Sequence, residues 1–261
     1  MKGFENALDD RAESFMQVGT VARVIAEKHC EVLVDRTTHV RWQHTIGLLR
    51  EVDTLADDTN IESEEVLERL EDFSEFAERY PSLTLDKLGS EVRNGMVNRT
   101  ERVLRLGKHV AEATCMDRLI ALRIAEGRLV AGYLEDVATP FVKDIQPGFH
   151  EKFMPVMKSM AVTANLLDSI LDRNMDYRNG NISIVPMPEF KKALQEEIKV
   201  QRVLARQAIL SHPAVMKEFV TMSWNRLINR VKHRDSRTSS LNLFRRDNLR
   251  TLERVNENVE V

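Results

Sequence analysis

An aspartate at every fourth position of one helical segment is the feature that most constrains this chain. Asp168, Asp172 and Asp176 recur within an apolar pattern of helical period. At 3.6 residues per turn they form one stripe that drifts by about 40° per step. Like charges at this spacing cost a helix about 0.2–0.5 kcal/mol per pair. The stripe therefore needs either a solvated face or a compensating cation. The apolar positions of the pattern are Met160, Val162, Leu166, Leu167, Ile170, Leu171 and Met175.

A second aspartate pair, Asp53 and Asp57, stands far upstream at the same spacing. Two helices that each present such a pair could face each other across a helical bundle. Carboxylate oxygens suit Mg²⁺, which takes one or two carboxylates and completes its shell with water and phosphate oxygens. Such a site would hold several Mg²⁺ ions and, through them, a diphosphate. A solvated polar face is the alternative interpretation of either pair.

This arrangement suits the ionisation of an allylic diphosphate. Metal ions neutralise the departing diphosphate, and a dry apolar cavity shields the carbocation from water. Arg50, one turn before Asp53, could add positive charge to the leaving group.

Composition favours an all-α protein. The 261 residues include only ten Gly and seven Pro, and Leu, Glu, Arg, Ala and Met are frequent. We find no internal repeat and no interdomain linker, so one helical domain over residues 1–261 is the simplest interpretation. From about Lys232 the periodicity weakens, and the sequence leaves open whether this tail is another amphipathic helix or only partly ordered.

Local signals predict where the helices begin and end. Ser63 opens a helix with capping chemistry, Pro155 suits a first turn, and Asn179-Gly180-Asn181 is the clearest stop. Residues 182–188 should be extended, because residues before Pro avoid the α region. We expect a short helix or arm over 4–18, then helices over about 18–55 with a break near Asp35, 63–79, 84–113, 116–138, 155–179, 188–210 and 213–231.

We expect a cytoplasmic protein. No stretch approaches the roughly 18–20 apolar residues of a membrane span, and the first residues lack an apolar signal core. Cys30 and Cys115 have no metal-ligand or redox spacing, which favours two buried thiols over a disulfide. The seven His form no Glu-x-x-His pair, which argues against a di-iron carboxylate bundle.

Charge is unevenly distributed along the chain. Residues 51–91 carry fourteen Asp and Glu against three Lys and Arg, whereas residues 226–250 carry eight Lys and Arg against two Asp. The basic stretch could touch a membrane surface peripherally, although a solvated face is the commoner explanation. Without aromatic interleaving or a known motif, it does not indicate nucleic-acid binding.

Three segments resemble the squalene and phytoene synthase family. Residues 48–60, Leu-Leu-Arg-Glu-Val-Asp-Thr-Leu-Ala-Asp-Asp-Thr-Asn, resemble its first motif, L-R-A-L-D-T-x-E-D-D-M-T. Residues 172–186, Asp-Arg-Asn-Met-Asp-Tyr-Arg-Asn-Gly-Asn-Ile-Ser-Ile-Val-Pro, resemble its second, D-x-x-x-D-x-x-x-G-R-x-Y-L-P. Residues 130–132, Val-Ala-Gly, resemble the family's V-A-G segment between them. The resemblance spans about residues 48–186.

The resemblance implies an isoprenoid synthase fold, a single-domain helical bundle with a central active-site cavity. It implies prenyl diphosphate substrates, such as farnesyl or geranylgeranyl diphosphate, and head-to-head joining of two of them. Whether reduction with NADPH follows is left open. The implied catalytic and Mg²⁺-binding residues are Asp53, Asp57, Asp172 and Asp176, with Asp168 as a further metal carboxylate. The implied diphosphate-binding residues are Arg50, Arg178 and Ser14.

Departures from the family pattern point to alternatives. Asp168 stands where the family usually has Asn, and an alternative register pairs Asp168 with Asp172. The tyrosines that usually precede V-A-G are replaced by Glu-Gly-Arg-Leu at positions 126–129. This loss favours a class I terpene synthase that cyclises a single prenyl diphosphate. A non-catalytic relative is a third hypothesis. Near this segment we expect Glu126, Arg128 and Glu135 to form surface ion pairs.

Overall fold

The computed structural model describes residues 16–56, 62–138, 148–185 and 188–221, which are mostly helical and include no strand. The predicted all-α class is thus confirmed for this part of the chain. The chain divides into two compact units, residues 1–219 and 220–261. Most of the predicted arm over 4–18 and the tail from Lys232 lie outside the described residues, and the single domain stays a prediction.

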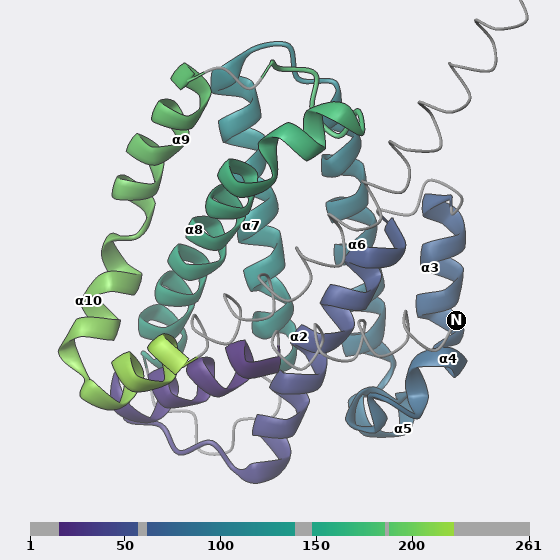
Figure 1. Ribbon diagram of the computed structural model, residues 1–261. Coiled ribbons are helices and arrows are strands. Elements are labelled where there is room, and N and C mark those ends of the chain that lie inside the picture. The colour runs from purple at the N-terminus through teal and green to yellow at the C-terminus, as the bar shows by residue number, and fades with distance from the viewer. Residues whose placement is uncertain (1–15, 57–61, 139–147, 186–187, 222–261) are drawn as a thin grey trace, which may run out of the picture. The chain divides into compact units, whose positions relative to one another are not determined.

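Figure 1 shows the helices of the described residues in chain order. They are a helix over residues 16–28, α2 (Arg36–Ala56), α3 (Ser63–Asp72), α4 (Ser74–Ala77), the 3₁₀ turn η1 (Pro81–Leu83), α5 (Leu85–Leu88), α6 (Ser90–Ala111), α7 (Met116–Ala138), α8 (Phe149–Arg178), α9 (Pro188–Gln201), α10 (Val203–Ser211) and a last helix that begins at residue 213.

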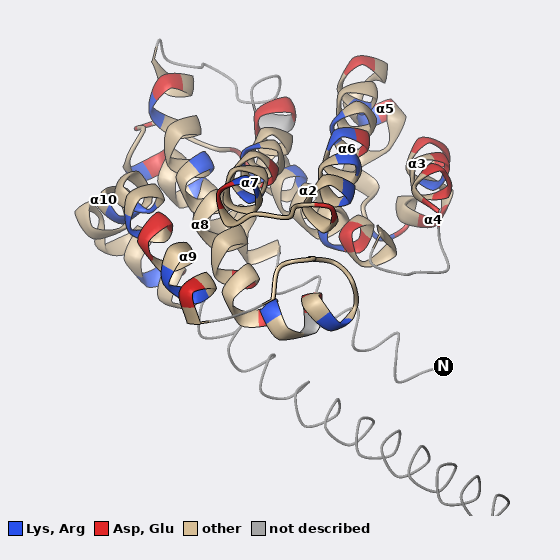
Figure 2. Ribbon diagram, turned by 90° about the horizontal axis from the view of Figure 1, so that it is seen from above, with Lys and Arg blue, Asp and Glu red and all other residues tan. Residues whose placement is uncertain are grey.

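Helix α7 occupies the middle of this unit. It packs most extensively against α8 and then against α6, and α2 also contacts it. Seen from above, α7 lies between α8 and α2, with α6 and α3 farther along the same direction (Figure 2). Helices α9 and α10 pack onto α8. The two helices that carry the aspartate pairs, α2 and α8, are therefore both neighbours of α7.

The predicted break near Asp35 is confirmed. Residues 31–35 are not helical, and α2 begins at Arg36. The Oδ1 atom of Asp35 accepts a hydrogen bond from the backbone N–H of Thr38 at 2.7 Å. This N-cap satisfies one donor that the first turn would otherwise leave unpaired.

The predicted helix over 63–79 ends earlier, at Asp72. Phe73 takes a left-handed conformation with φ of 61°, which separates α3 from α4. The backbone strain is offset by contacts: the ring is buried, and the guanidinium carbon of Arg93 lies 4.5 Å from its centroid. Arg93 Nη2 also donates to the carbonyl oxygens of Leu70 and Glu71, each at 2.8 Å. A side chain distant in sequence therefore ends this helix.

A similar interruption divides the predicted helix over 84–113. Gly89, with φ of 80°, separates α5 from α6. The next predicted helix, over 116–138, is confirmed with the same bounds as α7.

The predicted start of α8 at Pro155 is wrong. The helix begins at Phe149, so Pro155 lies in its interior. The rings of Phe149 and Phe153 stack with centroids 5.0 Å apart, and Phe153 packs against Trp42 of α2 at 5.4 Å. Burial of these aromatic rings outweighs the backbone donor that Pro155 lacks.

The predicted helix over 188–210 is interrupted at Arg202, between α9 and α10. The hydroxyl of Ser159, on α8, donates a hydrogen bond to the carbonyl of Gln201. The same hydroxyl accepts from the backbone N–H of Ala205 at 3.1 Å. Ser159 thus stands where a direct bond between Gln201 and Ala205 would continue the helix. The predicted break at His212-Pro213 is confirmed, and the last predicted helix is described only as far as residue 221.

The prediction of two buried thiols is half right. Cys30 is buried, and burial raises its pKa to about 11. Cys115 is exposed, and neither cysteine forms a disulfide. None of the described helices is both long enough and apolar enough to cross a membrane.

The acidic segment forms solvated helix faces. Acidic residues gather along α3 and α4 (Figure 2). Val66 and Leu70 point into the core, while most of the acidic residues between them and around them are exposed. The basic stretch over 226–250 lies outside the described residues.

Three histidines make the stability of this unit depend on pH. Burial is the main cause that lowers the pKa of His29, His39 and His44 below their usual value. Below about pH 6.5 the unfolded chain binds protons at these residues that the folded chain does not. Stability is therefore lost as pH falls through 6.5 toward the lowered values.

We predict that the melting temperature falls by several degrees between pH 7.5 and pH 5.5. His44→Gln should reduce this slope, whereas His109→Gln, at an exposed position of α6, should not. Calorimetry across this pH range measures both. A His44→Gln slope equal to that of the wild type would contradict the prediction.

Candidate functional site

The apolar stripe and the aspartate stripe of α8 lie on different sides of the helix. Val162, Leu166 and Ile170 are buried in one cluster with residues of α7 and α9. Asp168 and Asp172, on another side of the helix, are half-buried. Two positions of the predicted apolar pattern, Leu167 and Leu171, are exposed instead, and the side chain of Met175 lies outside the description.

The C-terminal end of α8 holds Asp176 in a defined turn. The carbonyl of Asp176 accepts a hydrogen bond from the backbone N–H of Asn181 at 2.8 Å. Gly180 takes a φ of 77°, a conformation that side-chain-bearing residues rarely adopt. The predicted stop at Asn179-Gly180-Asn181 is thus confirmed, and it fixes the last aspartate of the stripe.

The first motif is described in part. Asp53 lies near the end of α2, where its carboxylate forms an ion pair with Arg50, one turn earlier. The side chain of Asp53 is 57% exposed. Asp57 and Ser14 lie outside the described residues. Arg178 is exposed at the end of α8.

A single guanidinium links the two motifs. Arg123, on α7, has a side chain that is only 15% exposed. Its Nη1 lies 2.8 Å from Oε2 of Glu126, and its Nη2 lies 3.8 Å from Oδ2 of Asp176. Its Nε is buried without a hydrogen-bond partner in the described part of the chain.

The electrostatics of Arg123 also involve Asp53. Burial alone would lower the pKa of this guanidinium, but the carboxylates of Glu126, Asp176 and Asp53 raise it above its usual range. One aspartate from each motif therefore acts electrostatically on the same cation. Asp176 lies beside Arg123, and Asp53, paired with Arg50, acts on it from α2.

The side-chain amide of Asn165 holds Arg123 and Glu126 in place. Asn165 Nδ2, on α8, donates to the carbonyl of Arg123 at 2.7 Å and to Oε2 of Glu126 at 2.9 Å. Glu126 forms an ion pair as predicted, but its side chain is only 15% exposed, so the predicted surface location of this pair is wrong. Glu135 does form surface pairs, with His150 and Lys158.

Sequence reasoning missed Arg123, although one signal was available. Arg123 and Glu126 have the i, i+3 spacing of a helical ion pair. Arg123 also lies two turns before Val130, on the same face as the segment that resembles V-A-G. The pair alone reads as an ordinary surface salt bridge, and only the packing of α7 against α8 buries it.

The donor set is compatible with Mg²⁺ bound together with a phosphate ligand. Among the residues that the structure describes, no group of three or more His, Cys, Asp or Glu side chains gathers closely enough to hold a metal ion by itself. Mg²⁺ often uses only one or two carboxylates and takes phosphate oxygens and waters for the rest. Asp172 and Asp176, one turn apart and oxygen-only, fit that mode of binding.

The segment that precedes V-A-G leaves no room for a tyrosine at one position. A Cβ atom on Gly127 would lie 2.7 Å from the Cα of Val162, so α7 and α8 touch through their backbones there. The nearest tyrosine, Tyr133, follows the segment. Its hydroxyl shares a 2.6 Å hydrogen bond with Thr100 of α6, and burial raises its pKa.

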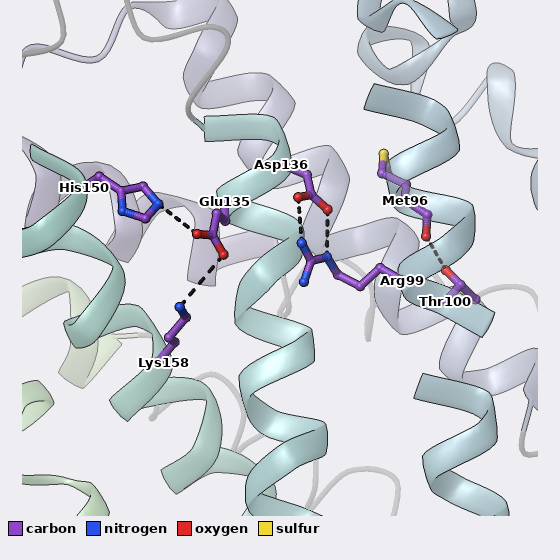
Figure 3. Close-up of polar contacts among 7 residues, drawn as sticks. All are labelled: Met96, Arg99, Thr100, Glu135, Asp136, His150 and Lys158. Atoms are coloured by element: carbon purple, nitrogen blue, oxygen red, sulfur yellow. Dashed lines mark hydrogen bonds and ion pairs between the residues drawn. The ribbon is translucent and has the colours of Figure 1, made fainter. Parts of the chain in front are cut away.

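A second arginine joins the other end of α7 to α6. Arg99, on α6, donates from Nε and Nη2 to both carboxylate oxygens of Asp136, at 2.7 and 2.6 Å. Figure 3 shows this pair, with Glu135 turned the other way toward His150 and Lys158. Gly132 makes room for it, because a Cβ there would lie 1.9 Å from Arg99 Nη1.

Comparison with known proteins adds no relative. No protein-family model, no curated protein and no solved structure matches this chain. The family resemblance therefore stays a prediction, as does the predicted central cavity. A groove formed by described residues lies along α9 and α10 and includes none of the predicted site residues; its lining residues are Lys199, Arg202, Val203, Arg206, Gln207 and Leu210.

Gly132→Ala should destabilise the protein by about 1–3 kcal/mol, because the new methyl group displaces Arg99 from a largely buried carboxylate. Gly107→Ala is the matched control. A Cβ at that helical position meets nothing within 4 Å, and it should stabilise by up to about 1 kcal/mol. Denaturant unfolding measures both free energies. Equal stability of Gly132→Ala and the wild type would show that Arg99 moves aside at no cost.

Proposed function

We propose that this protein is a Mg²⁺-dependent enzyme that ionises an allylic prenyl diphosphate. The observation that carries the proposal is the position of Asp176 beside the buried Arg123 guanidinium, on which Asp53 of the first motif also acts electrostatically. A diphosphate between two aspartate motifs requires that they face each other, and two unrelated solvated faces would have no reason to share a buried cation.

In this proposal the acidic residues bind the metal and the basic residues bind the diphosphate. Asp53, Asp172 and Asp176 would hold the metal, with Asp57 and Asp168 as the further carboxylates of each pair. Bound Mg²⁺ would neutralise the diphosphate as it departs. Arg50, one turn from Asp53, and Arg178, at the end of α8, would contact the diphosphate oxygens, since a guanidinium matches phosphate geometry.

We propose head-to-head joining of two prenyl diphosphates as the overall reaction, by analogy with squalene and phytoene synthases. Cyclisation of one prenyl diphosphate is the alternative, and a specific contact favours it. The close approach of Gly127 to Val162 excludes a tyrosine at that position, and Tyr133 is engaged with Thr100. Ionisation needs neither tyrosine, so both reactions share the proposed first step.

Incubation with farnesyl and geranylgeranyl diphosphate, with Mg²⁺ or with EDTA, tests the reaction. We expect Mg²⁺-dependent diphosphate release. A C30 or C40 product in gas chromatography–mass spectrometry would establish joining, and a C15 or C20 hydrocarbon or alcohol would establish cyclisation. No diphosphate release from either substrate would overturn the proposal in favour of a non-catalytic role.

Asp53→Asn and Asp172→Asn should each reduce diphosphate release by about 100-fold or more, because metal stabilisation of the leaving group supplies several kcal/mol. Asp86→Asn, an exposed aspartate on α5, is the control and should retain activity.

Stability gives an independent readout for the Asp172 variant. Asp172→Asn removes two like-charge pairs from the stripe, which should raise the metal-free melting temperature by about 1–3 °C. Reduced activity together with unchanged or higher stability indicates a site kept for function. A drop in melting temperature would instead mean that Asp172 contributes to folding.

A further inference from the structure

Arg123 carries a largely buried positive charge, and a guanidinium cannot bind Mg²⁺. The proposed reaction therefore leaves its role unexplained. Its two ion pairs are unequal. The contact to Glu126, 2.8 Å, is a hydrogen-bonded ion pair, whereas the contact to Asp176, 3.8 Å, is too long for a hydrogen bond. The contact between Asp176 and Arg123 is therefore electrostatic, while Glu126 and the hydrogen bond from Asn165 to the Arg123 carbonyl hold Arg123 itself in place.

We infer that Arg123 is an internal counter-ion that balances the two aspartate motifs when no metal is bound and that lowers their affinity for Mg²⁺. This inference rests on the proposed function, since it concerns the same metal site. Arg123 releases Asp176 more easily than Glu126, because its pair with Asp176 involves no hydrogen bond. Arg123 would keep Glu126 while Asp176 turns to the metal.

The side chains around Arg123 support this role. The charged groups that act on it are Glu126 from its own helix, Asp176 from α8 and Asp53 from α2, all acidic. Without Arg123, Glu126 and Asp176 would both lose the guanidinium that pairs with them, whereas Asp53 would keep its ion pair with Arg50. A structural salt bridge would need only one of them.

Charge removal at Arg123 should therefore change two properties in opposite directions. Arg123→Gln should lower the melting temperature in EDTA by several degrees, because it leaves carboxylates uncompensated. It should also lower the Mg²⁺ concentration at half-maximal stabilisation by about tenfold or more, since a nearby positive charge no longer opposes a divalent cation. Arg123→Lys keeps the charge and should leave the Mg²⁺ midpoint near the wild-type value.

Glu126→Gln should shift the Mg²⁺ midpoint in the opposite direction. The glutamine oxygen can still accept the hydrogen bond from Asn165, but it no longer neutralises Arg123. The guanidinium should then attract Asp176 more strongly, and the Mg²⁺ midpoint should rise. Arg128→Gln, at an exposed position of α7, is the matched control for Arg123→Gln: it removes a positive charge away from the site and should leave the midpoint unchanged.

The experiment is thermal unfolding of the full chain in EDTA and in rising MgCl₂, with ionic strength held constant by NaCl. A tighter midpoint in Arg123→Gln and a weaker one in Glu126→Gln support the inference, as does a Mg²⁺ response that appears only in Arg123→Gln. Equal midpoints in both variants, shifts in the same direction, or no Mg²⁺ response in any protein would overturn it.

The readout is metal-dependent stability, so this inference and the proposed function fail separately. Shifted midpoints without diphosphate release would overturn the enzymatic proposal and leave the role of Arg123 standing. Diphosphate release by the wild type with an unchanged Mg²⁺ midpoint in Arg123→Gln would overturn only the role of Arg123.

Discussion

Burial of the apolar face of α8 determines which way the aspartate side chains on its other faces point. Val162, Leu166 and Ile170 lie in a cluster with residues of α7 and α9, and burying each such side chain contributes about 1.5–3 kcal/mol. Rotating the helix would expose them, so the aspartate stripe has only one available direction. The position of Asp176 beside Arg123 is therefore a consequence of apolar packing, and the polar contacts refine it.

The aspartate stripe is a local cost that the fold carries. Each like-charge pair disfavours the helix slightly, yet α8 remains helical through Asp176 and ends only at Arg178. Tertiary packing and the Gly180 turn supply the compensation along the backbone. Arg123 supplies it in charge, from a neighbouring helix rather than from α8 itself.

The sequence predicted those features whose cause is local. The break at Asp35, the bounds of α7 and the turn at Gly180 each depend on residues within a few positions. It failed where a distant side chain intervenes. Arg93 ends α3, and the Ser159 hydroxyl interrupts α9, from helices that the local pattern does not reveal. For the same reason, the local pattern predicted the aspartates of the site but not Arg123, which only the packing of α7 against α8 brings to Asp176.

Two arginine–aspartate pairs join α7 to its neighbours with unequal strength. At one end, Arg99 holds Asp136 through two hydrogen bonds of 2.6 and 2.7 Å. About 20 Å away along the helix, Arg123 reaches Asp176 across 3.8 Å. Yet α7 is held to α8 at this end as well, because Asn165 binds the Arg123 carbonyl and Gly127 brings the two backbones into contact. The side chain of Asp176 can therefore turn away from Arg123 without any movement of α7.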